Sequence, residues 1–425
     1  MGIPSPQKRN IKMPNNKNLI LMLVSSAVVF GLLATASPAF AGSSETVLHS
    51  FGCCGTDGGG PVLANLVVDA AGNIYGTTPN GGAYGSGVVF ELIPNNGQWT
   101  EKILHNFGKG KDGRHPQAGL IFDTAGNLYG TTGRGGAYSY GTVFELVPAN
   151  GGWTEKVVYS FGNFNYGRRP WGSLIFDADG NLYGTTQYGG VNDFGTVFEL
   201  IPSNGGWTEK VLHSFNNNGK DGVFPNCRLT LDKSGNLYGT TSSGGTISCG
   251  TYGCGIVFEL TPGTSGKWTE KVLYNFGGNE IYPVGGVILD TAGNLYGNFV
   301  EGGVRGWGGV FELTLSSGKW TQKLLYSFVG APADGYYPSG GLTFDAAGNL
   351  YGTTVNGGAK YAGTVFELTP HNGKWTETLL HSFTGTPNDG LFPYAGITLD
   401  GSGNLFGTTF RGGSVDGGIV FEVTP

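Results

Sequence analysis

The sequence predicts an all-β fold, a seven-bladed β-propeller of four-stranded antiparallel blades. A stretch typified by residues 123–132, DTAGNLYGTT, recurs about every 55 residues, a period that indicates a repeat architecture. Its copies begin at Asp69, Asp123, Asp177, Asp232, Asp290, Asp345 and Asp400. Each unit holds four short β-rich runs and no useful helical period. Four antiparallel strands in each repeated unit are typical of a β-propeller.

The unit at residues 117–161 shows the expected order of elements. Its strands are predicted at 117–123, 128–132, 141–147 and 153–161. Asp123 is expected to cap the turn that follows it, and Gly126-Asn127 accepts positive φ. A Gly-rich loop then separates the second strand from the third.

The two ends of the repeat array predict that the ring closes. Residues 45–51 match the fourth strand of a unit, and residues 417–423 match the third. We therefore expect blade seven to consist of residues 394–423 plus 45–51. Pairing the first strand with the last hides two sheet edges.

The N-terminal 41 residues are predicted to be a secretory signal peptide rather than part of the fold. A basic region is followed by an apolar run at 19–36 and by Ala39-Phe40-Ala41, a cleavage pattern. The alternative is an uncleaved membrane anchor. No second apolar stretch reaches spanning length. We expect one propeller domain at 42–425, exported to the periplasm or the medium, with no membrane span and no anchor tail after cleavage.

The charge balance argues against nucleic acid and anionic lipid as partners. The chain has 24 Lys+Arg and 30 Asp+Glu, a net charge of −6. Residues 1–41 carry four basic and no acidic residues, so their removal leaves a net charge of −10. An acidic protein repels polyanions. A monomer is expected, and no cofactor is predicted apart from the Ca²⁺ considered below.

Export makes disulfides possible among the five cysteines. Cys249 and Cys254 flank one short loop and are the pair we expect. Cys53 and Cys54 are left open: they pair with each other, pair with Cys227, or stay reduced. The spacings do not fit a zinc site, and no histidine lies near.

Most recurrent residues have a structural interpretation. Glu145 and Lys156 are expected to face each other across a hairpin, as are four equivalent pairs. A tryptophan opens the fourth strand of six units and is interpreted as a packing residue: Trp99, Trp153, Trp207, Trp268, Trp320 and Trp375. One position of the same strand accepts His or Tyr, which favours packing over catalysis: His49, His105, Tyr159, His213, Tyr274, Tyr326 and His381.

The repeat resembles a known family. Gly-Asn-Leu-Tyr-Gly-Thr-Thr, a following Gly-Gly pair and Val-Phe-Glu-Leu are similar to the gloeo/verruco (GloVer) tandem repeat of exported bacterial proteins. The resemblance covers about residues 45–425, and more loosely the unit is similar to NHL-type propellers. It implies an exported propeller and no established activity. Asn298-Phe299 replaces Thr-Thr in one unit. Proteins of that family join the repeats to C-terminal anchors, and no such anchor is expected here.

Function is expected on one face of the propeller. The loops from strand four to strand one and from strand two to strand three emerge together there, and they vary most between units. The first loop reads Asp-Gly-x-x-Pro, beginning at Asp112, Asp221, Asp334 and Asp389. These aspartates are either turn residues or a ring of carboxylates that holds Ca²⁺.

The same face collects candidates for ligand binding: Arg168, Arg169, Trp171, Arg305, Trp307, Tyr336 and Tyr337. Flat rings and planar polar groups suit a glycan or a peptide, although some of these side chains could instead fill the central funnel. His115 is the one catalytic candidate, paired with Asp112 or Arg169. Standard catalytic motifs are absent. We favour a module that binds a glycan or a protein. The alternatives are a polysaccharide lyase or hydrolase and a structural surface or matrix protein.

Overall fold

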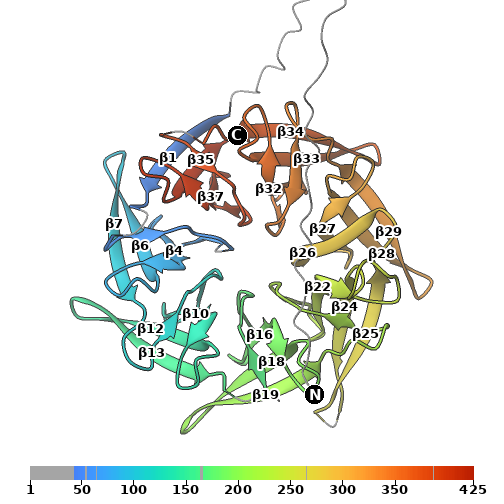
Figure 1. Ribbon diagram of the computed structural model, residues 1–425, viewed down its shortest axis with the longest axis horizontal. Coiled ribbons are helices and arrows are strands. Elements are labelled where there is room, and N and C mark those ends of the chain that lie inside the picture. Colours follow the sequence, from blue (N-terminus) through green and yellow to red (C-terminus); the bar gives the residue numbers. More distant parts are fainter. Residues whose placement is uncertain (1–42, 53–54, 64, 163–165, 265, 386) are drawn as a thin grey trace, which may run out of the picture. The chain divides into compact units, whose positions relative to one another are not determined.

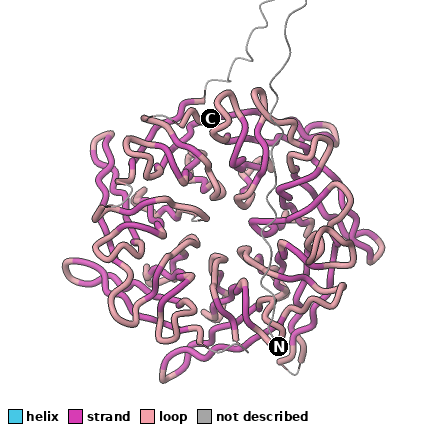
Figure 2. Tube along the Cα trace, in the orientation of Figure 1, coloured by secondary structure: helices cyan, strands magenta, loops and turns pink. Residues whose placement is uncertain are grey.

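Seven antiparallel sheets surround a common axis (Figure 1). The computed structural model describes residues 43–425 except 53–54, 64, 163–165, 265 and 386. These residues form strands and loops with no helix among them (Figure 2), and thus no helix able to cross a membrane. The predicted fold class is confirmed. The predicted signal peptide lies outside the described residues.

The blades repeat one strand order. Blades one to three are formed by β3 (Val67–Val68), β4 (Ile74–Thr78), β6 (Val88–Asn95) and β7 (Gln98–Asn106); β9 (Ile121–Phe122), β10 (Leu128–Thr132), β12 (Thr142–Ala149) and β13 (Gly152–Ser160); and β15 (Ile175–Phe176), β16 (Leu182–Thr186), β18 (Thr196–Ser203) and β19 (Gly206–Ser214).

Blades four to six follow the same order. They are formed by β21 (Thr230–Leu231), β22 (Leu237–Thr241), β24 (Ile256–Pro262) and β25 (Trp268–Asn275); β26 (Glu280–Leu289), β27 (Leu295–Gly302), β28 (Gly309–Ser316) and β29 (Lys319–Ser327); and β30 (Gly335–Pro338), β31 (Thr343–Phe344), β32 (Leu350–Gly357), β33 (Thr364–His371) and β34 (Lys374–Ser382).

Blade seven closes the ring with a strand from each end of the chain. It contains β36 (Thr398–Leu399), β37 (Leu405–Thr409), β39 (Ile419–Thr424) and β1 (Ser44–Ser50). β1 pairs with β39 from Ser44↔Thr424 to Ser50↔Ile419, with one irregularity near Val47. The predicted closure by the N-terminal strand is confirmed.

In every blade except blade five, the innermost strand is a segment of only two residues. We expected a strand over 117–123, whereas β9 covers only Ile121–Phe122. The residues before β9 pack against the neighbouring blade rather than their own: a Cβ on Gly119 would lie 2.6 Å from the Asn65 carbonyl oxygen. The tight approach of the blades therefore replaces hairpin pairing near the axis.

The hydrophobic core lies between adjacent blades. One cluster joins Tyr75 and Phe107 of blade one to Phe144 of blade two, with Trp153 packed against it. The ring centroids of Tyr75 and Trp153 lie 6.3 Å apart. Gly130 has no side chain because a Cβ there would lie 2.6 Å from Cζ of Phe144.

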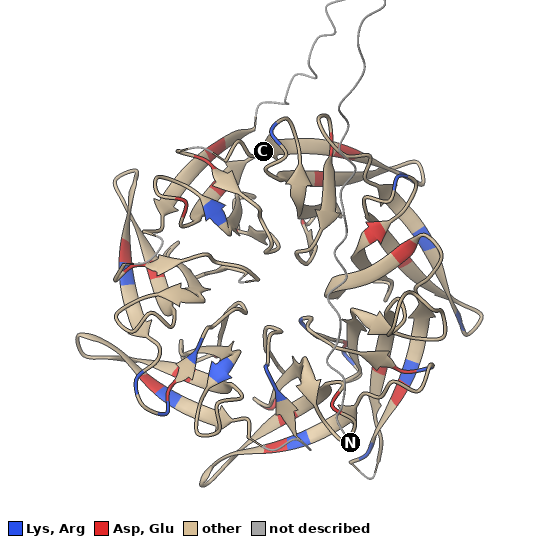
Figure 3. Cartoon of the chain, viewed as in Figure 1, with Lys and Arg blue, Asp and Glu red and all other residues tan. Residues whose placement is uncertain are grey.

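A repeated polar network joins the strands within the blades. The Asp123 carboxylate accepts hydrogen bonds from the backbone N–H groups of Ala125 and Asn127, at 2.8 and 2.9 Å. The Tyr129 hydroxyl donates to Glu145 Oε1 at 2.7 Å, and Lys156 pairs with Glu145 at 3.1 Å. Acidic and basic residues accordingly alternate along the outer strands (Figure 3).

The predicted pairs Glu91/Lys102, Glu199/Lys210 and Glu259/Lys271 also form. In blade five the prediction is only half right: Glu312 and Lys323 are register partners, yet Lys323 Nζ donates to the Gly373 carbonyl.

Candidate functional site

The variable loops of each unit pair with each other on one face. The loop into strand one and the loop after strand two form a short antiparallel ladder, which in five blades is a separate two-stranded sheet. These sheets are β2 (Gly58–Gly59) with β5 (Asn80–Gly81), β8 (Gly113–Arg114) with β11 (Arg134–Gly135), β14 (Gly167–Arg168) with β17 (Tyr188–Gly189), β20 (Gly222–Val223) with β23 (Ser243–Gly244), and β35 (Gly390–Leu391) with β38 (Arg411–Gly412). The sequence did not predict this pairing.

A ring of residues in the left-handed conformation follows these ladders. We call it the mouth ring: Gly60, His115, Arg169, Phe224, Tyr282, Tyr337 and Phe392. Each member directly precedes a proline, and φ is 55° at His115 and 61° at Tyr337. This backbone is uncommon for bulky residues and is unfavourable before proline.

Hydrogen bonds from the preceding blade hold the mouth ring in place. The His115 N–H donates to the Ser86 carbonyl at 2.8 Å, and the Arg169 N–H donates to the Tyr140 carbonyl at 2.9 Å. All seven members donate in this way. The backbone is thus constant while the side chain varies from glycine to arginine. Strained backbone positions of this kind often cluster at ligand sites.

The most polar pocket at the mouth lies between blades two and three. We call it the mouth pocket; it measures about 170 Å³ and is lined by His115, Gln117, Gly133, Arg134, Arg169 and Trp171. His115 Nδ1 lies 2.8 Å from the Pro79 carbonyl oxygen, so Nδ1 carries a proton and donates it. The sequence analysis singled out three of these residues: His115, Arg169 and Trp171.

Neighbouring groups position the side chains of the mouth pocket. A Cβ on Gly133 would lie 2.7 Å from Nε1 of Trp171, so the indole occupies the space left by the glycine. The Arg169 guanidinium stacks over the Tyr188 ring at 5.3 Å from its centroid. Arg168, by contrast, pairs with Asp193 beside the pocket. Of the three predicted arginines, Arg168, Arg169 and Arg305, only Arg169 lines the mouth pocket.

The other aromatic candidates form a second group between blades five and six. Trp307 lies 4.9 Å from Tyr336 and 5.7 Å from Tyr337, measured between ring centroids. Trp307 and Tyr336 line a cavity of about 150 Å³. Arg305 is exposed on the same loop as Trp307 and does not line that cavity.

The four candidate aspartates are separated, one at each of four joints between blades. Asp112, Asp221, Asp334 and Asp389 are buried, and each accepts a hydrogen bond from the backbone N–H of the next glycine. Among the described residues, no group of potential metal ligands contains two of them. Ca²⁺ binding stays a prediction.

The proposed pairing of His115 with Asp112 is wrong. Asp112 lies 3.0 Å from His105 Nε2 and also accepts from the Gly108 and Gly113 N–H groups. His115 instead shares the mouth pocket with Arg169.

We call the contact between the Asp-Gly loop of one blade and the outer strand of the next a joint. In six of the seven repeats a glutamate from the next blade lies at this joint. Glu155 lies beside Asp112 and His105, and burial raises its pKa to about 7. Burial also raises the pKa of the equivalent residues, to about 7 for Glu45, Glu209 and Glu270 and to about 8 for Glu101 and Glu377. We call these the joint glutamates.

Three of the joints bring together side chains of the types that ligate metal ions. One such group is His49, Asp57 and Glu101, and two equivalent groups occur at other joints. Other repeats have tyrosine in place of this histidine. In one of them the Tyr159 hydroxyl donates a hydrogen bond to the joint glutamate Glu209.

The structure contains the disulfide that the sequence analysis expected. Cys249 and Cys254 form a disulfide with Cα atoms 5.0 Å apart. Cys227 is buried and its thiol donates to the Thr240 carbonyl. Cys53 and Cys54 lie outside the described residues.

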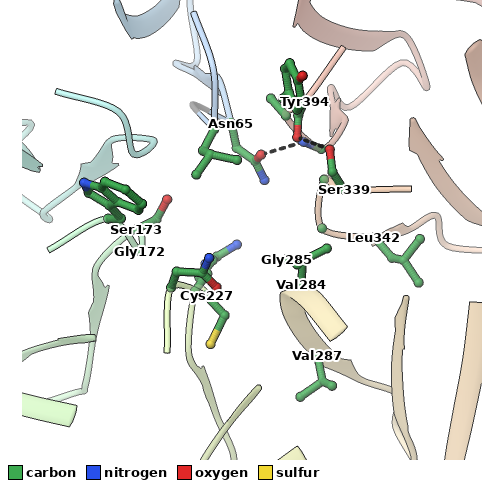
Figure 4. Close-up of a pocket in the computed structure, with 18 of the residues that line it drawn as sticks. Asn65, Gly172, Ser173, Cys227, Val284, Gly285, Val287, Ser339, Leu342 and Tyr394 are labelled. Carbon is green, nitrogen blue, oxygen red and sulfur yellow. Dashed lines mark hydrogen bonds between the residues drawn. The ribbon is translucent and has the colours of Figure 1, made fainter. Parts of the chain in front are cut away.

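A cavity of about 140 Å³ opens along the axis (Figure 4). Trp171 lines it as well as the mouth pocket. The axial cavity is further lined by Asn65, Ser173, Arg228 and Ser339, none of which the sequence analysis selected. The available signal was the repeat itself: Arg228 stands where four of the seven units have glycine.

The fold and the site define a closed repeat propeller with a variable mouth. The chain matches the family model described as the Gloeobacter/Verrucomicrobia repeat over residues 31–252 and 246–425, and it belongs to that family. A comparison with curated protein sequences found no match.

Two solved structures are similar to this chain. A Mycobacterium tuberculosis puromycin-hydrolyzing peptidase has 10% identity and a TM-score of 0.51, covering 83% of this chain and 52% of the peptidase, so this chain spans about half of that protein. A provisionally assigned 6-phosphogluconolactonase from Bacteroides uniformis has 14% identity and a TM-score of 0.47, covering 74% and 83%. The likeness to the peptidase shows the fold alone.

Proposed function

We propose that this protein is a binding module that takes a carbohydrate chain in the mouth pocket. The observation that carries this proposal is the combination there of one indole, Trp171, with the guanidinium groups of Arg134 and Arg169. An aromatic face packs against the C–H face of a sugar ring, and guanidinium groups donate to hydroxyls and carboxylates. The locked backbone of the mouth ring lowers the ordering cost of binding.

The cationic lining favours an acidic polysaccharide over a neutral one. Among the described residues of the mouth pocket, the ionisable side chains are His115, Arg134 and Arg169, with no carboxylate. The whole chain is acidic, with a net charge of −6, so attraction of a polyanion must be local. Export, which the sequence of residues 1–41 favours, would expose the pocket to such polymers.

The test is retention on immobilised polysaccharides, acidic polygalacturonate beside neutral cellulose. We expect the protein to bind polygalacturonate, and Trp171→Ala to weaken binding at least about tenfold, since a stacked aromatic contributes about 1–3 kcal/mol. Trp307→Ala in the second aromatic group is the matched control and should bind normally. Repeating the assay with a chelator tests the Ca²⁺ prediction.

Three outcomes would count against a binding module at this site. They are equal binding by Trp171→Ala, loss of binding only in Trp307→Ala, and no retention on any polysaccharide. Release of oligosaccharide that depends on His115 would instead make the protein a lyase or hydrolase.

A further inference from the structure

The axial channel contains a second set of equivalent positions, one from each blade. We call it the throat ring: Asn65, Gly119, Ser173, Arg228, Gly286, Gly341 and Gly396. Each member precedes the buried aliphatic residue that begins the inner strand segment. Four members are glycine, and Arg228 is the one long side chain.

The throat-ring glycines are explained by packing. A Cβ on Gly396 would lie 2.5 Å from the Gly341 carbonyl oxygen, and a Cβ on Gly286 would lie 2.4 Å from the Arg228 carbonyl oxygen. The inner segments of neighbouring blades therefore touch through their backbones at this level. Packing accounts for small residues here and gives no reason for an arginine.

The other polar members of the throat ring are used by the fold. Asn65 Oδ1 accepts from the Gly396 N–H at 2.9 Å, and Ser173 Oγ accepts from the Gly119 N–H at 3.0 Å. Both bonds join blades. Arg228 makes no hydrogen bond or ion pair with any described residue, and its side chain is exposed to the channel.

Arg228 stands between two cavities. It lines the axial cavity of about 140 Å³ and another of about 490 Å³, and Asn65 and Ser173 also line both. Among the described residues that line these cavities, Arg228 has the only charged side chain. The side chain of Arg228 is exposed to the channel, so its guanidinium is accessible to an anion that enters. The other polar members of the throat ring bond within the fold, whereas this cation keeps its donors for a ligand.

Asn226 adds a second unpaired group in the axial cavity. Its Oδ1 is buried and has no hydrogen-bond partner among the described residues. This oxygen can accept a hydrogen bond from a ligand hydroxyl. Leu63, Val284 and Leu342 supply apolar wall nearby. Figure 4 shows Val284 and Leu342 among the side chains around the opening.

We propose that the axial channel binds a small hydroxycarboxylate, its carboxylate on Arg228 and a hydroxyl on Asn226. A guanidinium group pairs with a carboxylate through two parallel N–H···O bonds. One cation matches one negative charge, and the apolar wall suits a short carbon skeleton better than an inorganic anion. The proposal does not rest on the carbohydrate function, because the mouth pocket is lined by Arg134 and Arg169 and the axial cavity by Arg228.

Calorimetric titration of the mature protein with lactate and with glucuronate tests the proposal. Glucose lacks the carboxylate and propionate lacks the hydroxyl, so both are expected to bind more weakly. Arg228→Gln should raise the Kd for lactate at least tenfold. Arg228→Lys keeps the charge but cannot form the two parallel N–H···O bonds, so it should have an intermediate effect. The double variant Arg134→Gln/Arg169→Gln, altered only at the mouth, should bind lactate normally.

Thermal unfolding supplies a readout that does not depend on calorimetry. Arg228→Gln removes an unpaired charge, so it should unfold at or above the wild-type temperature without ligand, and lactate should raise the melting temperature of the wild type alone. The proposal is overturned if no hydroxycarboxylate binds saturably, if Arg228→Gln binds as well as the wild type, or if only the mouth double variant loses binding. Equal affinity for inorganic phosphate and lactate would also overturn it.

Discussion

A single hydroxyl group in each of six blades links two carboxylates at the blade edge. Tyr129 donates to Glu145 at 2.7 Å and contacts Asp123 at 3.4 Å, and its pKa is raised chiefly by burial. Blade seven has Phe406 at this position, in the same register opposite Glu422. There, burial and the nearby Asp400 raise the pKa of Glu422.

Phe406→Tyr should therefore stabilise the propeller. The added hydroxyl would reach Glu422 and Asp400 as it does in the other blades, a gain of about 1.5–3 kcal/mol for a hydrogen bond to a charged group. Urea denaturation measures the difference. Tyr129→Phe is the converse change and should destabilise by about 1–3 kcal/mol, because the Glu145 and Asp123 carboxylates each lose one of their donors. If both variants unfold like the wild type, the hydroxyl network does not contribute to stability.

At the scale of elements, the joints between blades make stability depend on pH. The joint glutamates have folded-state pKa values of about 7 to about 8, above the ordinary value of 4.5. Between those limits the folded state holds more protons than the unfolded state. Stability from this source is complete below about pH 4.5 and is lost as pH rises through the folded-state pKa.

We expect the melting temperature to fall by about 5 °C or more between about pH 5.5 and about pH 8.5, a change of a few kcal/mol. Aspartates such as Asp69 and Asp389 have lowered pKa values, and they produce the opposite loss below about pH 4. Differential scanning calorimetry from acidic to basic pH measures both losses of stability.

Blade five supplies the matched control for the pH prediction. It has Gln322 in place of a joint glutamate, and the Gln322 amide donates to Glu280 Oε1 at 3.2 Å. Replacing Glu155, Glu209 and Glu270 by glutamine should raise stability at about pH 8.5 and flatten the pH profile. A profile as steep as that of the wild type would show that other groups cause the loss.

The elements that the sequence predicted well are the local ones. Turns such as Asp123–Asn127 and the three outer strands depend on nearby residues, and they form as expected. The short inner strands were not predicted because they depend on contacts with the neighbouring unit. The loop ladders were not predicted because they pair two loops that lie on either side of the first two strands of a unit.

In the candidate site, too, local features were predictable and contacts between distant segments were not. His115, Arg169 and Trp171 were recognisable as unusual residues in a variable loop, and the structure brings them together. Arg228 was missed because its neighbours in sequence are ordinary. Its significance appears only when its position is compared with the glycines of the other blades around the axis.

At the scale of the whole molecule, stability depends on one noncovalent pairing between the ends of the array. β1 supplies the outer strand of blade seven, and Val47 packs against the core between blades six and seven. Glu45 also completes the joint with His381 and Asp389. Without β1, β39 would expose an unpaired edge, and the buried faces of two blades would meet water.

Moving β1 to the other end of the chain should preserve the propeller. In a circular permutant, residues 43–51 would follow Pro425 through a short Asn-Gly turn, since Ser44 and Thr424 are register partners. Every blade would then be a local hairpin set, and we expect a melting temperature equal to or above that of the wild type. Simple deletion of residues 43–51 should lower it by at least about 10 °C or give aggregates. Scanning calorimetry and light scattering compare the two proteins. A deletion variant as stable as the permutant would show that closure through β1 contributes little to the fold.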